Sequence, residues 1–308
     1  MFSLLFPGQG SQIVGMGKEF YENFDYVKEL FQNADEIFNK KISKIILEGP
    51  EELLNQTENT QTAIFLISFS IFKVLEKETN LNIKNSQFYA GHSLGEYSAL
   101  CCAGSINFEQ TIDLLKNRGI AMQNAVPKGE GGMIAVLGIE INKLNEILNE
   151  YSKFECFVAN DNSPGQIVIS GKLNALELFE KNLKKKNIKA IKLPVSAPFH
   201  CPLMKNATQE MKNKILDTDF KDPLVPIISN VTASPQNKSE EIKKLLIKQI
   251  ENPVRWRESI INMINNGVKN FIEIGPGKVL SGLVKRIDRN VKLIQVNNLI
   301  DVKNITYD

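Results

Sequence analysis

Residues 91–95, which read GHSLG, constrain this chain more than any other segment, because they form a G-x-S-x-G motif between a strand-like and a helix-like stretch. In that setting the serine lies on a sharp turn that only small neighbours permit, with its hydroxyl exposed. The N-terminus of the following helix offers positive potential to a developing oxyanion. The motif therefore predicts that Ser93 is a nucleophile. A tight turn in which Ser93 only caps the helix is the alternative interpretation.

A serine nucleophile needs a base within hydrogen-bond reach, and the chain has only two histidines, His92 and His200. His92 adjoins Ser93, but neighbouring side chains on a tight turn usually point apart. His200 lies in a proline-flanked loop, where it could face a cleft at a domain boundary. We therefore expect His200 to be the base, with a histidine of purely structural role as the alternative. Cys201 lacks a helix N-terminus and is expected to pack.

Short apolar runs alternate with longer helical patterns, which is typical of an α/β protein with a largely parallel sheet. The expected strands are 3–6, 88–90, 225–229, 271–274 and 293–296, and the clearest expected helices are 60–78 and 108–124. In both helices apolar residues recur at three- and four-residue spacing.

The middle of the chain has a different pattern, bracketed by the glycine-rich residues 129–132 and the proline-bounded residues 194–198. The expected elements are strands at 133–137, 154–159, 166–170 and 188–193, helices at 142–151 and 173–186, and a loop at 160–165. The resulting β-α-β-β-α-β order is that of a ferredoxin-like unit. We therefore expect residues 128–198 to form a small subdomain inserted into a larger one, made of residues 1–127 and 199–308.

Composition argues against several classes of protein. The chain has 37 basic and 35 acidic residues, so nothing indicates a nucleic-acid partner. No apolar run is long enough to cross a bilayer, and the first residues lack the basic leader of a signal peptide, so no membrane association is expected. The four cysteines form no C-x-x-C pair and show no metal-ligand spacing. They are typical of reduced thiols in a cytoplasmic protein.

Two glycine-rich segments resemble nucleotide-binding motifs only superficially. The glycines between residues 8 and 17 do not form G-x-G-x-x-G, and Ile272 and Val279 occupy the Gly and Ser/Thr positions that a P-loop requires. We therefore expect neither NAD nor ATP. The glycines around Gln9 instead let backbone approach a ligand closely. The backbone N–H of Gln9 could form an oxyanion hole together with that of Leu94, although a plain glycine-rich turn fits the same residues.

Six segments together resemble one known family. They are FPGQGSQ at 6–12, GHSLGEYSAL at 91–100, NRGIAMQNAVP at 117–127, NSPGQIVISG at 162–171, SAPFHCPLM at 196–204 and EIGPGKVLSGL at 273–283. In this order, and nearly end to end, they resemble the malonyl-CoA:acyl-carrier-protein transacylases, the acyltransferase family of fatty-acid synthesis. The resemblance implies an α/β hydrolase-like core with a mostly parallel sheet and an inserted ferredoxin-like subdomain.

The resemblance also implies roles for particular residues. Ser93 would be the acylated nucleophile and His200 its general base, with the oxyanion held by the backbone N–H groups of Gln9 and Leu94. Gln249 matches a position whose backbone carbonyl orients the imidazole, where a Ser-His-Asp triad would use an aspartate.

Arg118 matches the arginine that binds the malonyl carboxylate in this family. A planar guanidinium can hold a carboxylate with two parallel hydrogen bonds, and in a closed pocket it would select malonyl over acetyl. An exposed helix arginine is the alternative interpretation. Leu94 and Phe199 also resemble the malonyl-type pattern of related polyketide acyltransferases.

The implied reaction is a two-step transfer of malonyl from malonyl-CoA, through a serine ester, to the phosphopantetheine thiol of acyl carrier protein. No metal and no cofactor are expected, since the coenzyme A thioester is a substrate. We expect a cytoplasmic monomer. The lysine-rich segment 181–192 could steer an acidic carrier protein or simply be a solvated surface. A thioesterase or lipase, a transferase for another acyl group, and a non-catalytic carrier-protein-binding module are the alternatives.

Overall fold

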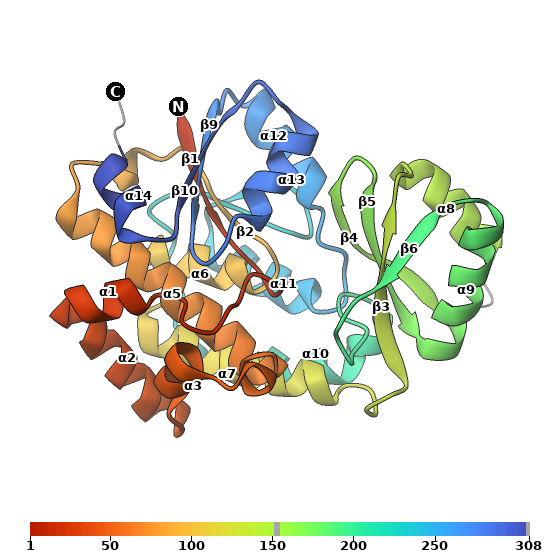
Figure 1. Cartoon of the computed structure of the whole chain (residues 1–308), viewed down its shortest axis with the longest axis horizontal. Coiled ribbons are helices and arrows are strands. Elements are labelled where there is room, and N and C mark those ends of the chain that lie inside the picture. Colours follow the sequence, from red (N-terminus) through yellow and green to blue (C-terminus); the bar gives the residue numbers. More distant parts are fainter. Residues whose placement is uncertain (151–154, 306–308) are drawn as a thin grey trace.

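Two β-sheets lie side by side in the computed structural model, which describes residues 1–150 and 155–305 (Figure 1). The larger sheet has the strand order β10-β9-β1-β2-β7-β8, and its neighbours are parallel except for the antiparallel pair β7 and β8. Its strands are β1 (Phe2–Phe6), β2 (Tyr89–Gly91), β7 (Ile227–Ile228), β8 (Pro235–Gln236), β9 (Asn270–Ile274) and β10 (Lys292–Val296). The predicted α/β class with a mostly parallel sheet is confirmed.

Helices surround this sheet, and all five residues of β1 are buried, as expected for a parallel strand covered on both faces. The helices of this part are α1 (Lys18–Asn23), α2 (Asp25–Phe38), α3 (Ile42–Glu48), α4 (Glu51–Leu54), α5 (Thr57–Glu78), α6 (Leu94–Cys102), α7 (Phe108–Asn124), α10 (Lys205–Asp217), α11 (Ser239–Gln249), α12 (Trp256–Asn265), α13 (Val279–Ile287) and α14 (Leu299–Asn304), with single 3₁₀ turns at Ile83–Asn85 and Pro202–Met204. Helix α7 has its predicted bounds, because a capping box between Asn107 and Gln110 fixes its start.

The predicted strand at 225–229 is shorter in the structure, where only β7 pairs. Pro226 has no backbone N–H to donate to a neighbouring strand. After β7 the chain turns back on itself, with the N–H of Ala233 donating to the carbonyl of Ser229.

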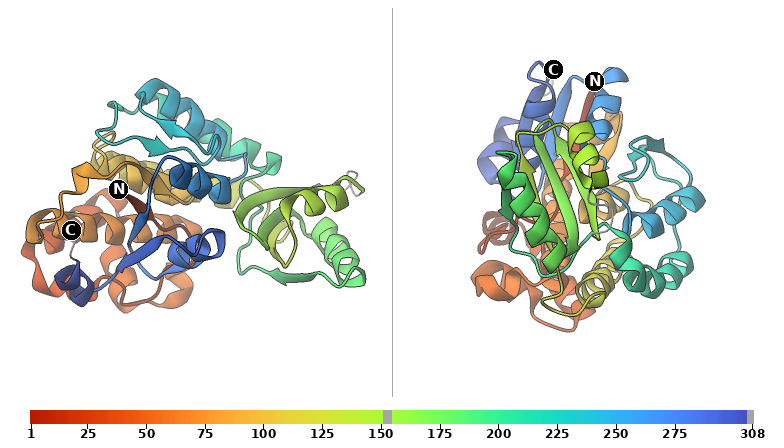
Figure 2. Two further views of the ribbon diagram at one scale, coloured as in Figure 1. Left: turned by 90° about the horizontal axis from the view of Figure 1, so that it is seen from above. Right: turned by 90° about the vertical axis from the view of Figure 1, so that its right-hand side faces the viewer.

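The smaller sheet is antiparallel, with strand order β4-β5-β3-β6 (Figure 2). Its elements are β3 (Gly131–Leu137), α8 (Ile141–Glu150), β4 (Cys156–Ser163), β5 (Gln166–Lys172), α9 (Leu173–Lys185) and β6 (Lys189–Lys192). The predicted β-α-β-β-α-β order is therefore present, and α8 and α9 pack on the sheet through an apolar cluster of their own. Tyr151 and Phe154, where a helix end and a strand start were predicted, lie outside the described residues.

The loop predicted at residues 160–165 is wrong, because β4 continues to Ser163 and only a short turn joins it to β5. The polar, turn-like composition of this segment is overridden by partners from the other part of the molecule. Asp161 donates its backbone N–H to the carbonyl of Val254, and Val254 donates to the carbonyl of Ala159. Residue 254 thus pairs with β4 in parallel and adds a short bridge to its outer edge.

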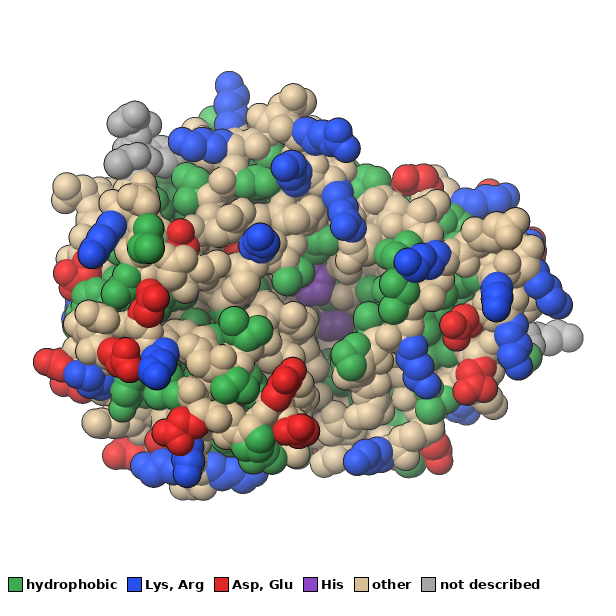
Figure 3. All heavy atoms as spheres, in the orientation of Figure 1, with side chains coloured by type: hydrophobic (Ala, Val, Ile, Leu, Met, Phe, Trp, Pro, Cys, Tyr) green, Lys and Arg blue, Asp and Glu red, His purple; other side chains and the backbone are tan. Residues whose placement is uncertain are grey.

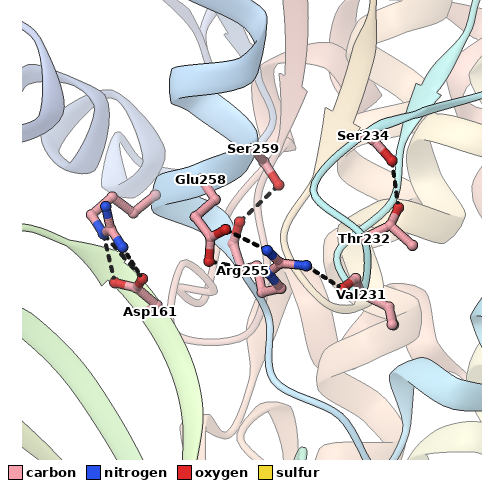
Figure 4. Close-up of polar contacts among 8 residues, drawn as sticks. Asp161, Val231, Thr232, Ser234, Arg255, Glu258 and Ser259 are labelled. Carbon is pink, nitrogen blue, oxygen red and sulfur yellow. Dashed lines mark hydrogen bonds and ion pairs between the residues drawn. The ribbon is translucent and has the colours of Figure 1, made fainter. Parts of the chain in front are cut away.

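The first residues of α12 join the two parts of the molecule (Figure 4). Arg257 contacts both carboxylate oxygens of Asp161 on β4, at 2.8–3.1 Å. Nearby, Arg255 pairs with Glu258 and donates to the carbonyl of Val231, at 3.2 Å, in the turn after β7. The smaller sheet is therefore attached to the larger part at α12 as well as through its own two chain connections.

Among the described residues, no helix combines the length and apolarity that crossing a membrane requires. All four cysteines, Cys101, Cys102, Cys156 and Cys201, are free thiols.

Candidate active site

The turn between β2 and α6 has the geometry that the G-x-S-x-G motif predicts. Ser93 has φ 54° and ψ −109°, a backbone conformation that non-glycine residues seldom adopt. A Cβ on Gly91 would lie 1.9 Å from the carbonyl of Gly95, and one on Gly95 would lie 2.2 Å from the carbonyl oxygen of Phe6. Both positions therefore require glycine. The Ser93 side chain makes no capping hydrogen bond to α6, so its hydroxyl is available for other contacts.

His200 lies against this hydroxyl, with Nε2 at 2.7 Å from Ser93 Oγ. Its Nδ1 lies 2.8 Å from the backbone carbonyl of Gln249. Since a carbonyl can only accept, Nδ1 carries the proton and Nε2 presents its lone pair to the serine. Burial, followed by the nearby Arg118 cation, lowers the pKa of His200 to about 3. The imidazole is therefore neutral, and able to accept a proton, at neutral pH.

The other histidine faces away from the serine hydroxyl. His92 Nε2 lies 2.8 Å from Oδ1 of Asn162 on β4, and its ring packs on Trp256 at a centroid distance of 5.6 Å. Burial lowers the pKa of His92, so this histidine is also neutral. Its hydrogen bond with Asn162 connects the serine turn to the smaller sheet.

Arg118 enters the site from α7 and is only 1% exposed, so the interpretation as an exposed helix arginine is wrong. Nη1 donates to Gln61 Oε1 at 2.7 Å, and Nη2 donates to Gln249 Oε1 at 2.8 Å and to Ser93 Oγ at 3.1 Å. The guanidinium also lies 5.5 Å from the ring centre of Tyr97, within cation–π range. A buried cation is therefore in direct contact with the serine hydroxyl.

A second layer of polar groups, which the sequence reasoning missed, lies beneath the turn. Glu96 Oε2 accepts from Gln249 Nε2 at 2.7 Å and from the backbone N–H of Asn230 at 3.1 Å. Oδ1 of Asn230 in turn accepts from the backbone N–H of Ser93 at 2.8 Å. Glu96 stands three residues after the serine, in the S-x-x-E spacing of a capping box, and that spacing is the signal that could have found it.

These groups border a cavity of about 220 Å³ between the two sheets. Figure 3 shows histidine side chains at the bottom of the corresponding cleft. Gln9, after β1, and Leu94, at the start of α6, both line the cavity. Neither donates its backbone N–H to any of the described residues, so both N–H groups are available to a ligand. Phe199 and Met133 contribute apolar walls.

Comparison with known proteins agrees with this geometry. A family model for the acyl transferase domain matches residues 3–302. The malonyl CoA-acyl carrier protein transacylase of Bacillus subtilis is 46% identical over 299 residues, which cover 96% of this chain and 93% of that protein. The chain belongs to the malonyl CoA-acyl carrier protein transacylase family.

Solved structures of this acyltransferase family have the same fold. The acyl-carrier-protein-S-malonyltransferase of Bartonella henselae has a TM-score of 0.95 and 43% identity, covering 98% of this chain and 97% of that one. A malonyl-transacylase solved in complex with a type II PKS acyl-carrier protein has a TM-score of 0.94 and 37% identity, covering 98% and 97%.

Two other features of this acyltransferase bear on its chemistry. No group of three or more His, Cys, Asp or Glu side chains within residues 1–150 and 155–305 is placed to hold a metal ion. Cys201 is buried, its thiol donates to the carbonyl of Pro198 at 3.0 Å, and burial raises its pKa to about 12. This cysteine therefore packs, as the sequence predicts.

Proposed function

We propose that this acyltransferase moves a malonyl group from malonyl-CoA to the phosphopantetheine thiol of acyl carrier protein, in fatty-acid biosynthesis, through an ester on Ser93. The observation that carries the proposal is the buried Arg118 guanidinium, 3.1 Å from the serine hydroxyl. A cation at this distance favours an acyl group that ends in a carboxylate. The names of the relatives, and the complex of one of them with an acyl-carrier protein, support the same donor and acceptor.

In the proposed acylation step, Ser93 Oγ gives its proton to Nε2 of His200 and attacks the thioester carbonyl carbon. The carbonyl electrons move to oxygen, which is held by the N–H groups of Gln9 and Leu94. When the tetrahedral intermediate collapses, the C–S bond breaks. The coenzyme A sulfur then leaves with the proton from His200, and the malonyl ester of Ser93 remains.

We assign the orientation of His200 to the backbone carbonyl of Gln249. The 2.8 Å contact at Nδ1 supports this role, because it fixes the tautomer and stabilises the imidazolium that forms during each step. A neutral carbonyl stabilises the imidazolium less than an aspartate would, which fits a base whose pKa lies well below neutrality.

The second step reverses the first. The carrier-protein thiol gives its proton to His200 and attacks the malonyl-serine carbonyl, and the ester C–O bond breaks with return of the proton to Ser93. Throughout both steps, Arg118 would bind the malonyl carboxylate by its planar guanidinium and so exclude acetyl groups. Because nucleophile, base and oxyanion donors are all supplied by the chain, we propose that no metal or cofactor takes part.

We further propose the division of the chain that the sequence suggests. Residues 1–127 and 199–308 would form the catalytic subdomain, and residues 128–198 the inserted ferredoxin-like subdomain. The separate apolar cluster of the smaller sheet supports this division. We also propose that the protein is a monomer and that it is located in the cytoplasm. The four free thiols support the cytoplasmic location.

Intact-mass analysis tests the proposal directly. Purified protein is mixed with malonyl-CoA without acceptor, beside Ser93→Ala and an acetyl-CoA control. A single malonyl adduct on the unaltered chain, absent from Ser93→Ala and discharged by carrier protein, is the expected result. Rapid release of free malonate without an adduct would indicate a hydrolase. No reaction with any acyl-CoA would leave only the binding-module interpretation.

A further inference from the structure

Glu96 is a buried carboxylate beside the active site that the proposed mechanism does not use. It belongs to the first turn of α6 and is only 2% exposed. An ionised carboxylate is not buried without compensation, so its partners indicate what it does.

Glu96 and Arg118 are linked through one side-chain amide. Arg118 Nη2 donates to Oε1 of Gln249 at 2.8 Å, and Nε2 of Gln249 donates to Glu96 Oε2 at 2.7 Å. The amide has an acceptor at one end and donors at the other, so the cation and the anion together fix its orientation. Glu96 thus balances the charge of Arg118 without occupying the guanidinium, which stays in contact with Ser93 Oγ.

The surroundings of the carboxylate contain few other ionisable groups. Arg118 of α7 is the cation that acts on it, and Tyr97 of α6 is its titratable neighbour. Strands β1 and β7 carry no ionisable side chain, β2 carries only Tyr89, and α5 places the neutral Gln61 beside Arg118. Gln249 and Asn230, which contact Glu96 directly, are amides. Its ionisation therefore depends mainly on burial, then on the hydrogen bonds from Gln249 and Asn230, with Arg118 as the charged group that acts on it.

We propose that Glu96 is the counter-ion of Arg118 in the free enzyme, and that it takes up a proton from solvent when the substrate carboxylate binds Arg118. The inference rests on the proposed function, because it requires an anionic acyl group. Two carboxylates would then compete for one buried cation, and like charges at short range oppose ionisation. The substrate carboxylate is the stronger acid, so Glu96 is the group that becomes protonated.

Burial allows Glu96 to take up a proton near neutral pH. Burial raises the pKa of Glu96 to about 7 in the free enzyme, although Gln249, Asn230 and Arg118 each lower it. Binding of malonyl is then coupled to a proton, whereas a neutral acyl group leaves the Arg118–Gln249–Glu96 arrangement unchanged. The KM for malonyl-CoA should accordingly rise with pH above neutrality.

Proton uptake during acylation tests this inference. The protein is mixed with malonyl-CoA in weak buffer containing a pH indicator, and adducts are counted by intact mass in the same samples. Forming the serine ester and a protonated coenzyme A thiol consumes no proton, so the background at pH 7 is small. A carboxyl group half-ionised at pH 7 gives an expected uptake of about 0.5 proton per adduct, falling toward zero at pH 5.

Glu96→Gln is the informative variant, because both observed hydrogen bonds go to Oε2 and an amide oxygen can accept them. It should form the adduct without proton uptake and with a KM independent of pH. Glu29→Gln, at an exposed glutamate of α2, is the matched control and should behave as the unaltered chain does.

The outcomes separate this inference from the proposed function. An adduct without proton uptake in the unaltered chain would overturn the role of Glu96 and leave the transferase intact. Uptake that persists in Glu96→Gln would assign the proton to another group and also overturn it. Absence of any adduct would refute the proposed function itself. If Glu96→Gln does not fold, the inference is tested by the pH dependence of proton uptake in the unaltered chain. Proton uptake per adduct that does not change between pH 5 and pH 7 would contradict the inference.

Discussion

Two pairings of an arginine with a buried carboxylate are built differently in this molecule. At the junction of the two sheets, Arg257 contacts both oxygens of Asp161 directly. In the active site, Arg118 and Glu96 are separated by the side-chain amide of Gln249. The direct pair commits both charges to each other and joins β4 to α12. The separated pair keeps a guanidinium buried and balanced while leaving it in contact with the reacting hydroxyl.

The difference shows how one chain can use the same two side-chain types for attachment and for binding. A direct bidentate pair is rigid and specific, but it has little capacity left for a ligand. An intervening amide retains the electrostatic balance and weakens the competition that a substrate carboxylate must overcome. The four predictions below test this contrast, from the largest expected effect to the smallest.

Arg118→Ala should have the largest effect, lowering the rate of malonyl adduct formation by about 100- to 1000-fold, because two charge-assisted hydrogen bonds to the substrate are lost. The rate with acetyl-CoA should change far less. Time-resolved intact mass measures both, with a melting curve to verify folding. Arg289→Ala, at an exposed arginine, is the matched control. An equal loss of rate with malonyl-CoA and acetyl-CoA would contradict the proposed binding of the malonyl carboxylate by Arg118.

Asp161→Asn should lower the free energy of unfolding by about 3 kcal/mol, because it leaves the Arg257 cation, whose side chain is 22% exposed, without its charged partner at the junction. Urea unfolding of the variant beside Asp219→Asn, at an exposed aspartate, measures the difference. The malonyl specificity of the folded variant should be retained. A loss of stability no larger than that of the control would mean that the direct pair does not hold the two parts together.

Glu96→Gln should instead stabilise the chain at pH 8, by about 3 kcal/mol. The pKa of Glu96 is raised from 4.5 to about 7, so the folded state binds the extra proton and loses stability as pH rises through this window. The glutamine variant has no ionisable group at this position, so its stability does not decrease in this way. Below pH 4.5 the two chains should be equally stable. Unfolding curves at pH 4.5, 6 and 8 provide the measurement, and a gain that does not vary with pH would contradict it.

The rate of reaction of Ser93 with a neutral fluorophosphonate should be almost constant between pH 8 and pH 5. Burial, with the Arg118 cation as the second cause, lowers the pKa of His200 to about 3, and Arg118 can contribute because Glu96 balances its charge only at a distance. A histidine of ordinary pKa would lose about 30-fold over this range as it became protonated. Labelling rates corrected with Ser93→Ala make the test. A midpoint near pH 6.5 would show that His200 titrates normally.

Local patterns were enough to predict part of this structure. The turn around Ser93 and the bounds of α7 depend on residues within a few positions of each other, and both agree with the structure. The β-α-β-β-α-β order followed from the alternation of apolar runs. His200 followed from the need for a base and from the small number of histidines, and its distance from Ser93 now supports that choice.

Features that depend on distant partners could not be predicted from the sequence. The segment 160–163 is rich in Asn and Asp, and its strand conformation depends on Val254 and Arg257, which lie about 90 residues later in the chain. The burial of Arg118 depends on enclosure by α5 and α11. Glu96 gains its partners from Asn230 and Gln249, at sequence separations of 134 and 153 residues. No pattern local to α6 specifies those contacts.

The bridge between β4 and residue 254 has a consequence for synthesis of the chain on the ribosome. Strand β4 is at the edge of the smaller sheet, and its outer partner is translated more than 90 residues after Ala159. Until then the nascent subdomain presents an uncovered strand edge, which is a template for pairing with other chains. The polar Asn160, Asp161 and Asn162 along that edge discourage such pairing before α12 emerges. Asn160 and Asn162, which later border the catalytic cleft, thus also protect the unfinished protein from aggregation.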